Sequence, residues 1–180
     1  MSQNCTSKMT SINTKKLPAI YKKLDWRKLV EDNFFANHGR LKIVDWGCGR
    51  ETDHIRKFLD SVVPFYGYDY YPYDPYWLSE KDNTKALIIV PDIYICSNVL
   101  NVIDDDRTMN SIHDRFLEYK NRLGTKFFIT VYEGDKSGIS QESKADCWQR
   151  NQTIDFYMRH MSEDIRKKVL CHSTDIKYVI

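Results

Sequence analysis

The chain has 180 residues, of which 42% are hydrophobic and 29% charged, and its 27 Lys and Arg nearly balance its 25 Asp and Glu. This length and composition fit one globular domain and exclude collagen-like and low-complexity disordered chains. The five scattered cysteines form no CxxC pair, and no run of about 18 apolar residues occurs, so we expect no disulfide framework, no metal site, no membrane partner and a cytoplasmic protein.

Residues 1–16 are polar and basic, which predicts a flexible arm without a secretory signal, followed by a single domain over residues 17–180. Nine Lys or Arg stand against three acids within residues 1–43. Such a segment suits phosphates, so a nucleic-acid partner is one interpretation and a solvated helix face is the other. Apolar residues at helical spacing, with Pro18 in the first turn, predict one helix over residues 17–35.

Apolar segments alternate with helical patterns along the rest of the chain. The predicted strands lie at 41–45, 64–69, 86–90, 92–99 and 126–132, with one or two more in 169–180. The predicted helices begin near Thr52 or Asp53, after acids at 104–106, and at Thr153, the last running to Lys168. Residues 133–143 are predicted to be a loop. The alternation predicts an α/β, Rossmann-like sandwich of about seven mostly parallel strands with helices on both faces.

The strongest chemical signal is a glycine turn at the end of the first predicted strand, Asp45-Trp46-Gly47-Cys48-Gly49. Glycines at this place allow a sharp turn and a close approach to a ligand. Asp69 follows 20 residues after Gly49, the spacing at which an acid at the end of the second strand reaches a ribose. Carboxylates at Asp45 and Glu51 repel a pyrophosphate, whereas they suit a ligand that carries an ammonium and a sulfonium.

The turn resembles the first motif of class I S-adenosylmethionine-dependent methyltransferases, and Asp69 resembles their ribose-binding acid. The stretch Ser97-Asn98-Val99-Leu100-Asn101-Val102-Ile103 is similar to the fourth-strand motif of a phage and bacterial subgroup, which would act in the host cytoplasm. Further segments similar to that subgroup are Lys16-Leu17-Pro18-Ala19, Ile129-Thr130-Val131-Tyr132-Glu133-Gly134-Asp135 and Lys144-Ala145-Asp146-Cys147-Trp148-Gln149. The resemblance covers residues 16–180.

The resemblance implies S-adenosylmethionine as cofactor and methyl transfer to an unidentified acceptor. The implied cofactor-binding residues are Asp45, Trp46, Gly47, Cys48, Gly49, Asp69, Tyr70, Asn98 and Val99. The acceptor is expected near Asn98, Asn101, Lys144, Asp146 and Gln149, with residues 134–151 forming a mobile lid. No catalytic residue is predicted, because aligning the acceptor with the sulfonium methyl supplies most of the rate.

Two departures from the family pattern keep alternatives open. Glu51 stands where many members have a third glycine, and no acid follows the predicted third strand to contact adenine. These favour a non-enzymatic protein that binds S-adenosylmethionine or a host partner on the same fold. The basic arm and the aromatic residues 65–77 favour nucleic-acid modification, although the Asn/Asp-Pro-Pro-aromatic and Pro-Cys motifs of DNA base methyltransferases are absent.

Overall fold

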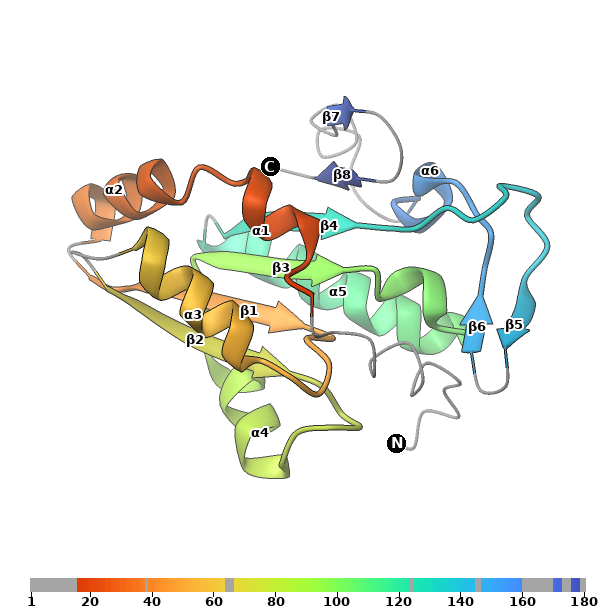
Figure 1. The fold of residues 1–180 in the computed structure, drawn as a ribbon, viewed down its shortest axis with the longest axis horizontal. Coiled ribbons are helices and arrows are strands. Elements are labelled where there is room, and N and C mark those ends of the chain that lie inside the picture. Colours follow the sequence, from red (N-terminus) through yellow and green to blue (C-terminus); the bar gives the residue numbers. More distant parts are fainter. Residues whose placement is uncertain are drawn as a thin grey trace.

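The computed structural model describes residues 16–37, 39–63, 67–123, 125–144, 147–159, 170–172 and 176–178, and centres on a parallel sheet of four strands (Figure 1). In spatial order the strands are β2 (Tyr68–Tyr73), β1 (Leu41–Trp46), β3 (Ile93–Ser97) and β4 (Lys126–Thr130). This order is compatible with the 2-1-4-5 portion of a doubly wound sheet, with no counterpart of its third strand among the described residues. The predicted α/β class and a parallel sheet are therefore confirmed.

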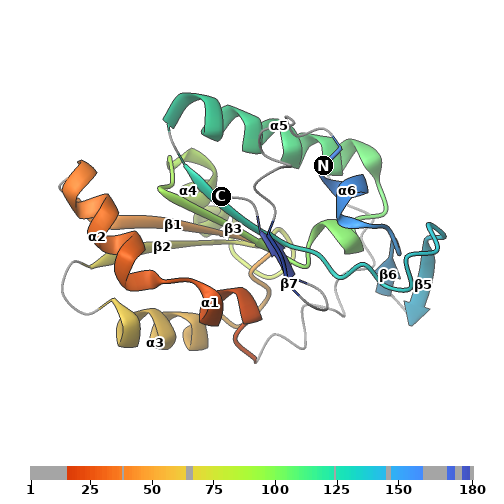
Figure 2. The same ribbon diagram turned by 90° about the horizontal axis from the view of Figure 1, so that it is seen from above.

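Helices cover both faces of the sheet (Figure 2). One face packs against α1 (Ala19–Lys23), α2 (Trp26–Asn37) and α3 (Asp53–Val62), and the other against α4 (Glu80–Ile88), α5 (Asp106–Leu123) and α6 (Ile154–Tyr157). Apolar residues of β1 and β3 are divided between the two cores, so β3 is apolar up to Ser97 and β1 is apolar except at Lys42 and Asp45. The predicted cap of α5 is confirmed, since Asp105 Oδ2 accepts a hydrogen bond from the Thr108 backbone N–H at 2.8 Å.

The prediction of one helix over residues 17–35 is wrong, because the chain breaks between α1 and α2. Leu24 adopts an extended conformation, with φ −79° and ψ 137°. Asp25 then starts a second helix, its carboxylate accepting a hydrogen bond from the Lys28 backbone N–H at 3.0 Å. A local side-chain cap therefore outweighs the helical spacing of the apolar residues.

The second strand begins later than predicted, at Tyr68 rather than near residue 64, and ends at Tyr73. Gly67 precedes it in the left-handed region, with φ +72°, and lies against the Arg40 guanidinium, where a side chain would collide. The strand then accepts Pro72, because β2 lies at the edge of the sheet and Pro72 needs no partner on its outer side. Residues 64–66 lie outside the described part of the chain.

The predicted third strand at 86–90 is wrong, since residues 80–88 form α4. The Ser79 side chain caps this helix by accepting a hydrogen bond from the Asp82 backbone N–H at 3.1 Å, and Glu80 and Asp82 place acidic charge in its first turn. Ala86 is buried while Ile88 is exposed. The apolar run at residues 86–90 thus includes the carboxyl end of a capped helix that packs beside β2.

The remaining described strands form antiparallel pairs, so the prediction of about seven mostly parallel strands is correct only for four of them. The expected loop 133–143 includes β5 (Gln141–Lys144), which pairs with β6 (Cys147–Gln149). The tail forms β7 (Leu170–His172) and β8 (Ile176–Tyr178) as predicted, and β8 runs beside β4. The helix predicted from Thr153 is described only as the short α6. Within these residues, no helix has the length and apolar character needed to cross a membrane.

Candidate ligand site at the switch point of the sheet

The sheet reverses its winding direction at β1. From β1 the chain passes through α3 to β2 on one side, whereas β3 lies on the other side of β1. In open α/β sheets, ligands bind beyond the carboxyl ends of the two strands that flank such a switch point. Residues 47–49 follow β1 and residues 98–99 follow β3, so the structure brings the predicted glycine turn and the predicted fourth-strand motif to this place.

Gly47 is required at the turn for two reasons. Its φ is +72°, a conformation that L-residues rarely adopt, and a Cβ at this position would overlap the Val99 side chain. Gly49 is also left-handed, with φ +77°. The turn therefore lies directly against the first residues after β3, and Gly47 contacts Val99 at the switch point.

The backbone amides of the turn are committed to the end of β2. Gly47 N and Cys48 N donate to the Tyr73 carbonyl oxygen at 2.8 and 3.2 Å. Gly49 N donates to Asp74 Oδ2 at 3.0 Å. Phosphate-binding loops instead aim such amides at the anion. These three amides are therefore not free to bind an anion.

Asp74 is the acid that follows the second strand, in place of the predicted Asp69. It is buried, and its Oδ1 accepts hydrogen bonds from the Tyr76 and Trp77 backbone N–H groups at 2.9 and 3.2 Å. Burial raises the pKa of Asp74, and the hydrogen bonds from the Tyr76, Gly49 and Trp77 amides oppose the rise. Asp74 was not predicted as a site residue, because the second strand was expected to end at Asp69.

Asp69 lies near the start of β2, beside Lys42 of β1, where it forms an ion pair with Arg40 Nε at 2.8 Å. The prediction that Asp69 ends the second strand is therefore wrong, since it lies toward the amino ends of the strands. Two signals could have corrected the prediction. Gly67 precedes the strand, and Asp74 lies between Tyr73, the last residue of the strand, and Pro75.

Asp45 points into the protein rather than out of the turn. Its Oδ2 accepts hydrogen bonds from the Tyr21 and Tyr70 hydroxyl groups, each at 2.7 Å. Asp45, Tyr21 and Tyr70 are all buried. Burial raises the pKa of Asp45 to about 6, the two hydroxyl groups lower it, and the nearby Asp74 raises it further. The predicted site residue Tyr70 thus contacts Asp45, and Tyr21 is a neighbour that the sequence analysis did not identify.

Trp46 and Cys48 support the turn from inside the molecule. The Trp46 ring stacks on Tyr73 with 3.9 Å between the ring centroids. Burial strongly raises the pKa of the Cys48 thiol, with Asp45 and Asp74 adding to the rise. A buried thiol of this kind is a poor nucleophile. Glu51, the other carboxylate of the predicted site, is exposed.

The structure joins two of the residues predicted to lie near an acceptor, although they are far apart in sequence. Asn101, in the short 3₁₀ helix η3 (Leu100–Val102), donates from Nδ2 to Gln149 Oε1 at 3.1 Å, and both side chains are buried. Asn98 is exposed after β3. Lys144 belongs to β5, and Asp146 lies outside the described residues. The expected grouping is therefore present for Asn101 and Gln149.

The predicted lid is attached to the body of the protein near its end. Arg150 N donates to the Asn101 carbonyl oxygen at 2.9 Å, and the Arg150 guanidinium donates to the Ile103 carbonyl oxygen and forms an ion pair with Asp106. Gly138 N donates to the Asn151 carbonyl oxygen at 3.0 Å. A lid that moves would therefore pivot near residues 149–151, and its mobility stays a prediction.

Asn98 offers a test of backbone strain at this site. Its φ is +56°, and its amide donates to the Thr130 carbonyl oxygen at 2.8 Å. We expect Asn98→Gly to leave the thermal midpoint unchanged or raised, because glycine adopts this conformation freely, and Asn98→Ala to cost about 1 kcal/mol. Urea unfolding of the parent and both variants measures the differences in unfolding free energy. Equal stabilities of the two variants would contradict the strain.

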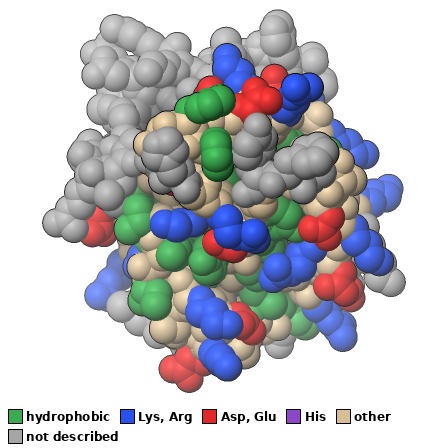
Figure 3. Space-filling view, turned by 90° about the vertical axis from the view of Figure 1, so that its left-hand side faces the viewer, with side chains coloured by type: hydrophobic (Ala, Val, Ile, Leu, Met, Phe, Trp, Pro, Cys, Tyr) green, Lys and Arg blue, Asp and Glu red, His purple; other side chains and the backbone are tan. Residues whose placement is uncertain are grey.

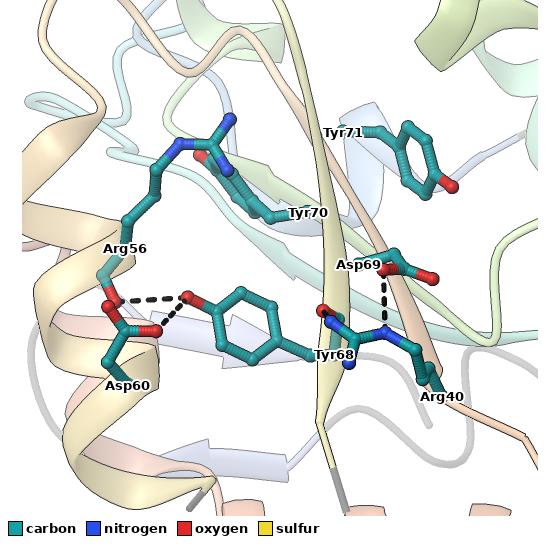
Figure 4. A pocket seen from close by; sticks show the side chains of 7 residues that line it. All are labelled: Arg40, Arg56, Asp60, Tyr68, Asp69, Tyr70 and Tyr71. Carbon is teal, nitrogen blue, oxygen red and sulfur yellow. Dashed lines mark hydrogen bonds and ion pairs between the residues drawn. The ribbon is translucent and has the colours of Figure 1, made fainter.

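A separate pocket of about 400 Å³ lies between β2 and α3 (Figure 4). Its lining residues are Arg40, Arg56, Asp60, Tyr68, Asp69, Tyr70 and Tyr71. Arg40 pairs with Asp69 and also donates to the Tyr68 carbonyl oxygen, which helps protect the edge of the sheet. The Tyr68 hydroxyl donates to Asp60 at 2.7 Å, and the Arg56 guanidinium lies over the Tyr70 ring at 4.9 Å. Most of its charged groups therefore already contact other groups of the protein.

The end of the molecule from which the strands start carries both signs of charge (Figure 3). Lys and Arg side chains lie interspersed with Asp and Glu side chains on this face. Two examples are the ion pairs Arg40–Asp69 at 2.8 Å and Lys126–Asp32 at 3.3 Å. This arrangement differs from the single-sign stripe that a nucleic-acid backbone attracts.

Comparisons of the chain with protein-family models, with curated proteins and with solved structures gave no match. The site therefore consists of a glycine turn at a switch point, with two buried carboxylates beside it and with the amides of Gly47, Cys48 and Gly49 bonded to the end of β2.

Proposed function

We propose that this chain binds S-adenosylmethionine at the switch point and transfers its methyl group to an unidentified acceptor. The observation that carries the proposal is the pair of buried carboxylates, Asp45 and Asp74, on either side of the turn at residues 47–49. Two negative charges in a poorly solvated place attract a cation and repel a pyrophosphate. The resemblance of the turn to the methyltransferase motif agrees with this preference.

The protein's part in the chemistry is to bind and orient. Gly47 packs against the Val99 side chain and so holds the ends of β1 and β3 together beneath the ligand that we propose. The cofactor supplies an electrophilic methyl group on a sulfonium. We assign the acceptor to the neighbourhood of Asn98, which is exposed after β3, and of the buried Asn101–Gln149 pair. Alignment of this kind can contribute about 7–11 kcal/mol to a displacement.

The direct test is calorimetry of the full chain with S-adenosylmethionine, S-adenosylhomocysteine and NAD. We expect micromolar binding of the first two, equal to about −8 kcal/mol, and no binding of NAD. As a control, Asp69→Asn changes a carboxylate near the start of β2, away from the switch point, and should leave the affinity unchanged. Tight binding of NAD with none of S-adenosylmethionine would contradict the proposal.

A transfer assay then separates enzyme from binding protein. Labelled methyl groups from S-adenosylmethionine are offered with DNA, tRNA, protein and metabolite extracts, and incorporation into any one of them identifies the acceptor class. Incorporation into DNA or tRNA would favour the nucleic-acid alternative.

A second candidate function is ligand binding without catalysis. It is favoured by the bonding of the two acids, because Asp45 Oδ2 already accepts two hydroxyl groups and Asp74 already accepts three amides. Their charge can attract a ligand, while few lone pairs are left to hold one directly. Binding of S-adenosylmethionine without transfer to any of the four extracts would support this candidate.

A further inference from the structure

The short helix α1 reaches the switch point through a buried hydrogen bond. Tyr21 is the third residue of this five-residue helix, and its hydroxyl donates to Asp45 Oδ2 at 2.7 Å. The Tyr21 ring packs between Trp26, whose indole Nε1 donates to the Tyr21 carbonyl oxygen at 2.6 Å, and Phe58 of α3. The ring is therefore held by its neighbours, and the hydroxyl has a fixed direction.

The two hydroxyl donors favour the charged form of Asp45. Burial raises the pKa of Asp45 to about 6, and the hydrogen bonds from Tyr21 and Tyr70 act against that rise. Hydrogen bonds to an ionised group are stronger than those to a neutral one, so each hydroxyl favours the carboxylate over the acid. Tyr70 is supported in turn by Arg56, which lies over its ring (Figure 4).

We infer that Tyr21 is a positioning residue of the switch-point site, which together with Tyr70 holds Asp45 as a charged carboxylate beneath the glycine turn and so makes α1 part of that site. The inference rests on the proposed function, because it assigns to Asp45 the charge that attracts the cationic ligand. Tyr21 acts through Asp45 and touches no reacting atom.

The polar and titratable groups around Asp45 come from every element packed against it. They are Tyr21 of α1, Tyr70 of β2, Cys48 of the turn, Asp74 after β2 and Cys96 of β3. Burial holds the pKa values of Tyr21, Tyr70 and both thiols well above their ordinary ranges. Asp45 is therefore the group of this set whose pKa lies near 6. Burial also raises the pKa of Asp74, which is held by the backbone amides of Tyr76, Gly49 and Trp77.

The test compares Tyr21→Phe with Tyr94→Phe in the full chain. Tyr94 of β3 is also fully buried, but its hydroxyl has no hydrogen-bond partner among the described residues. It is not one of the groups named above around Asp45. Affinity for S-adenosylmethionine is measured between pH 5 and 9. In the parent it should rise through about pH 6, as Asp45 ionises, and in Tyr21→Phe this rise should move upward by about one pH unit.

The affinity of Tyr21→Phe should then fall about fivefold at pH 6 and by less than about twofold at pH 8.5, in proportion to the ionised fraction of Asp45. The loss should be smaller for S-adenosylhomocysteine, which lacks the sulfonium charge. Tyr94→Phe should keep the parent profile. A uniform loss at every pH, or an unshifted profile, would overturn the inference and assign Tyr21 a packing role alone.

The same variants are unfolded in urea across this pH range without ligand. The pH at which stability falls as Asp45 ionises should also move upward in Tyr21→Phe. If the parent does not bind S-adenosylmethionine but the unfolding profile of Tyr21→Phe is shifted, the proposed function is contradicted. The role of Tyr21 in holding Asp45 as a carboxylate is then still supported. An unshifted unfolding profile would overturn the inference whether or not the parent binds ligand.

Discussion

Replacing Asp45 by Asn should make the ligand-free protein more stable near pH 7.5, by up to about 3 kcal/mol. The reason is that the folded-state pKa of Asp45 is raised from 3.8 to about 6 by burial. Such a group contributes stability below its unfolded pKa, and this contribution is lost as the pH rises through about 6. At neutral pH the parent therefore carries a buried charge that it would be more stable without, and Asn removes the charge while retaining an acceptor for Tyr21 and Tyr70.

The measurement is urea unfolding of the parent and Asp45→Asn at several pH values between 4 and 8. The gain should be near zero at about pH 4, grow through pH 6 and then level off. Affinity for S-adenosylmethionine should fall in the same variant, so that stability and binding move in opposite directions. A gain that does not depend on pH, or a variant less stable than the parent at pH 7.5, would contradict the assignment of a charged Asp45.

Replacing Gly47 by Ala should destabilise the fold by about 2–5 kcal/mol and abolish ligand binding. About 1–2 kcal/mol follows from the φ of +72°, which an L-residue occupies only under strain. A further 1–3 kcal/mol, roughly, follows from the overlap of the new Cβ with the Val99 side chain. Both terms act at the point where β1 and β3 meet, so the site is expected to lose its shape along with the stability.

The two terms are separable with a second substitution. Val99→Ala removes both γ carbons that the new Cβ would meet, so the double variant Gly47→Ala/Val99→Ala should recover the packing part and retain the conformational part. Unfolding free energies of the parent, both single variants and the double variant give the coupling. Strictly additive effects would show that Val99 does not crowd the turn.

Several features of the fold follow from local sequence. The apolar runs of β1, β3 and β4, the acidic cap of α5 and the glycine turn after β1 were all predictable, because each depends on neighbouring residues. Elements whose local signals compete were not. Helical spacing over residues 17–35 competes with the Asp25 cap, and the apolar run at 86–90 competes with the Ser79 cap. In both cases capping decided.

The candidate site divides in the same way. The turn at residues 47–49 and the motif at residues 97–99 could be placed at strand ends from the sequence. Asn101 could be expected close to that motif. The pairing of Asn101 with Gln149 across 48 residues, and of Asp45 with Tyr21 and Tyr70, depends on which strands and helices come together.

The sequence by itself determined the alternation of strands and helices, the glycine turn and the presence of acids near it, since residue type and spacing carry this information. Only the tertiary structure decided which acid belongs to the site. A start of β2 four residues later moves Asp69 toward the amino ends of the strands and brings Asp74 to the turn, because each residue advances a strand by about 3.3 Å. It also decided that Asp45 faces two tyrosine hydroxyl groups, since the direction of a side chain on a central strand depends on the register with its neighbours on both sides.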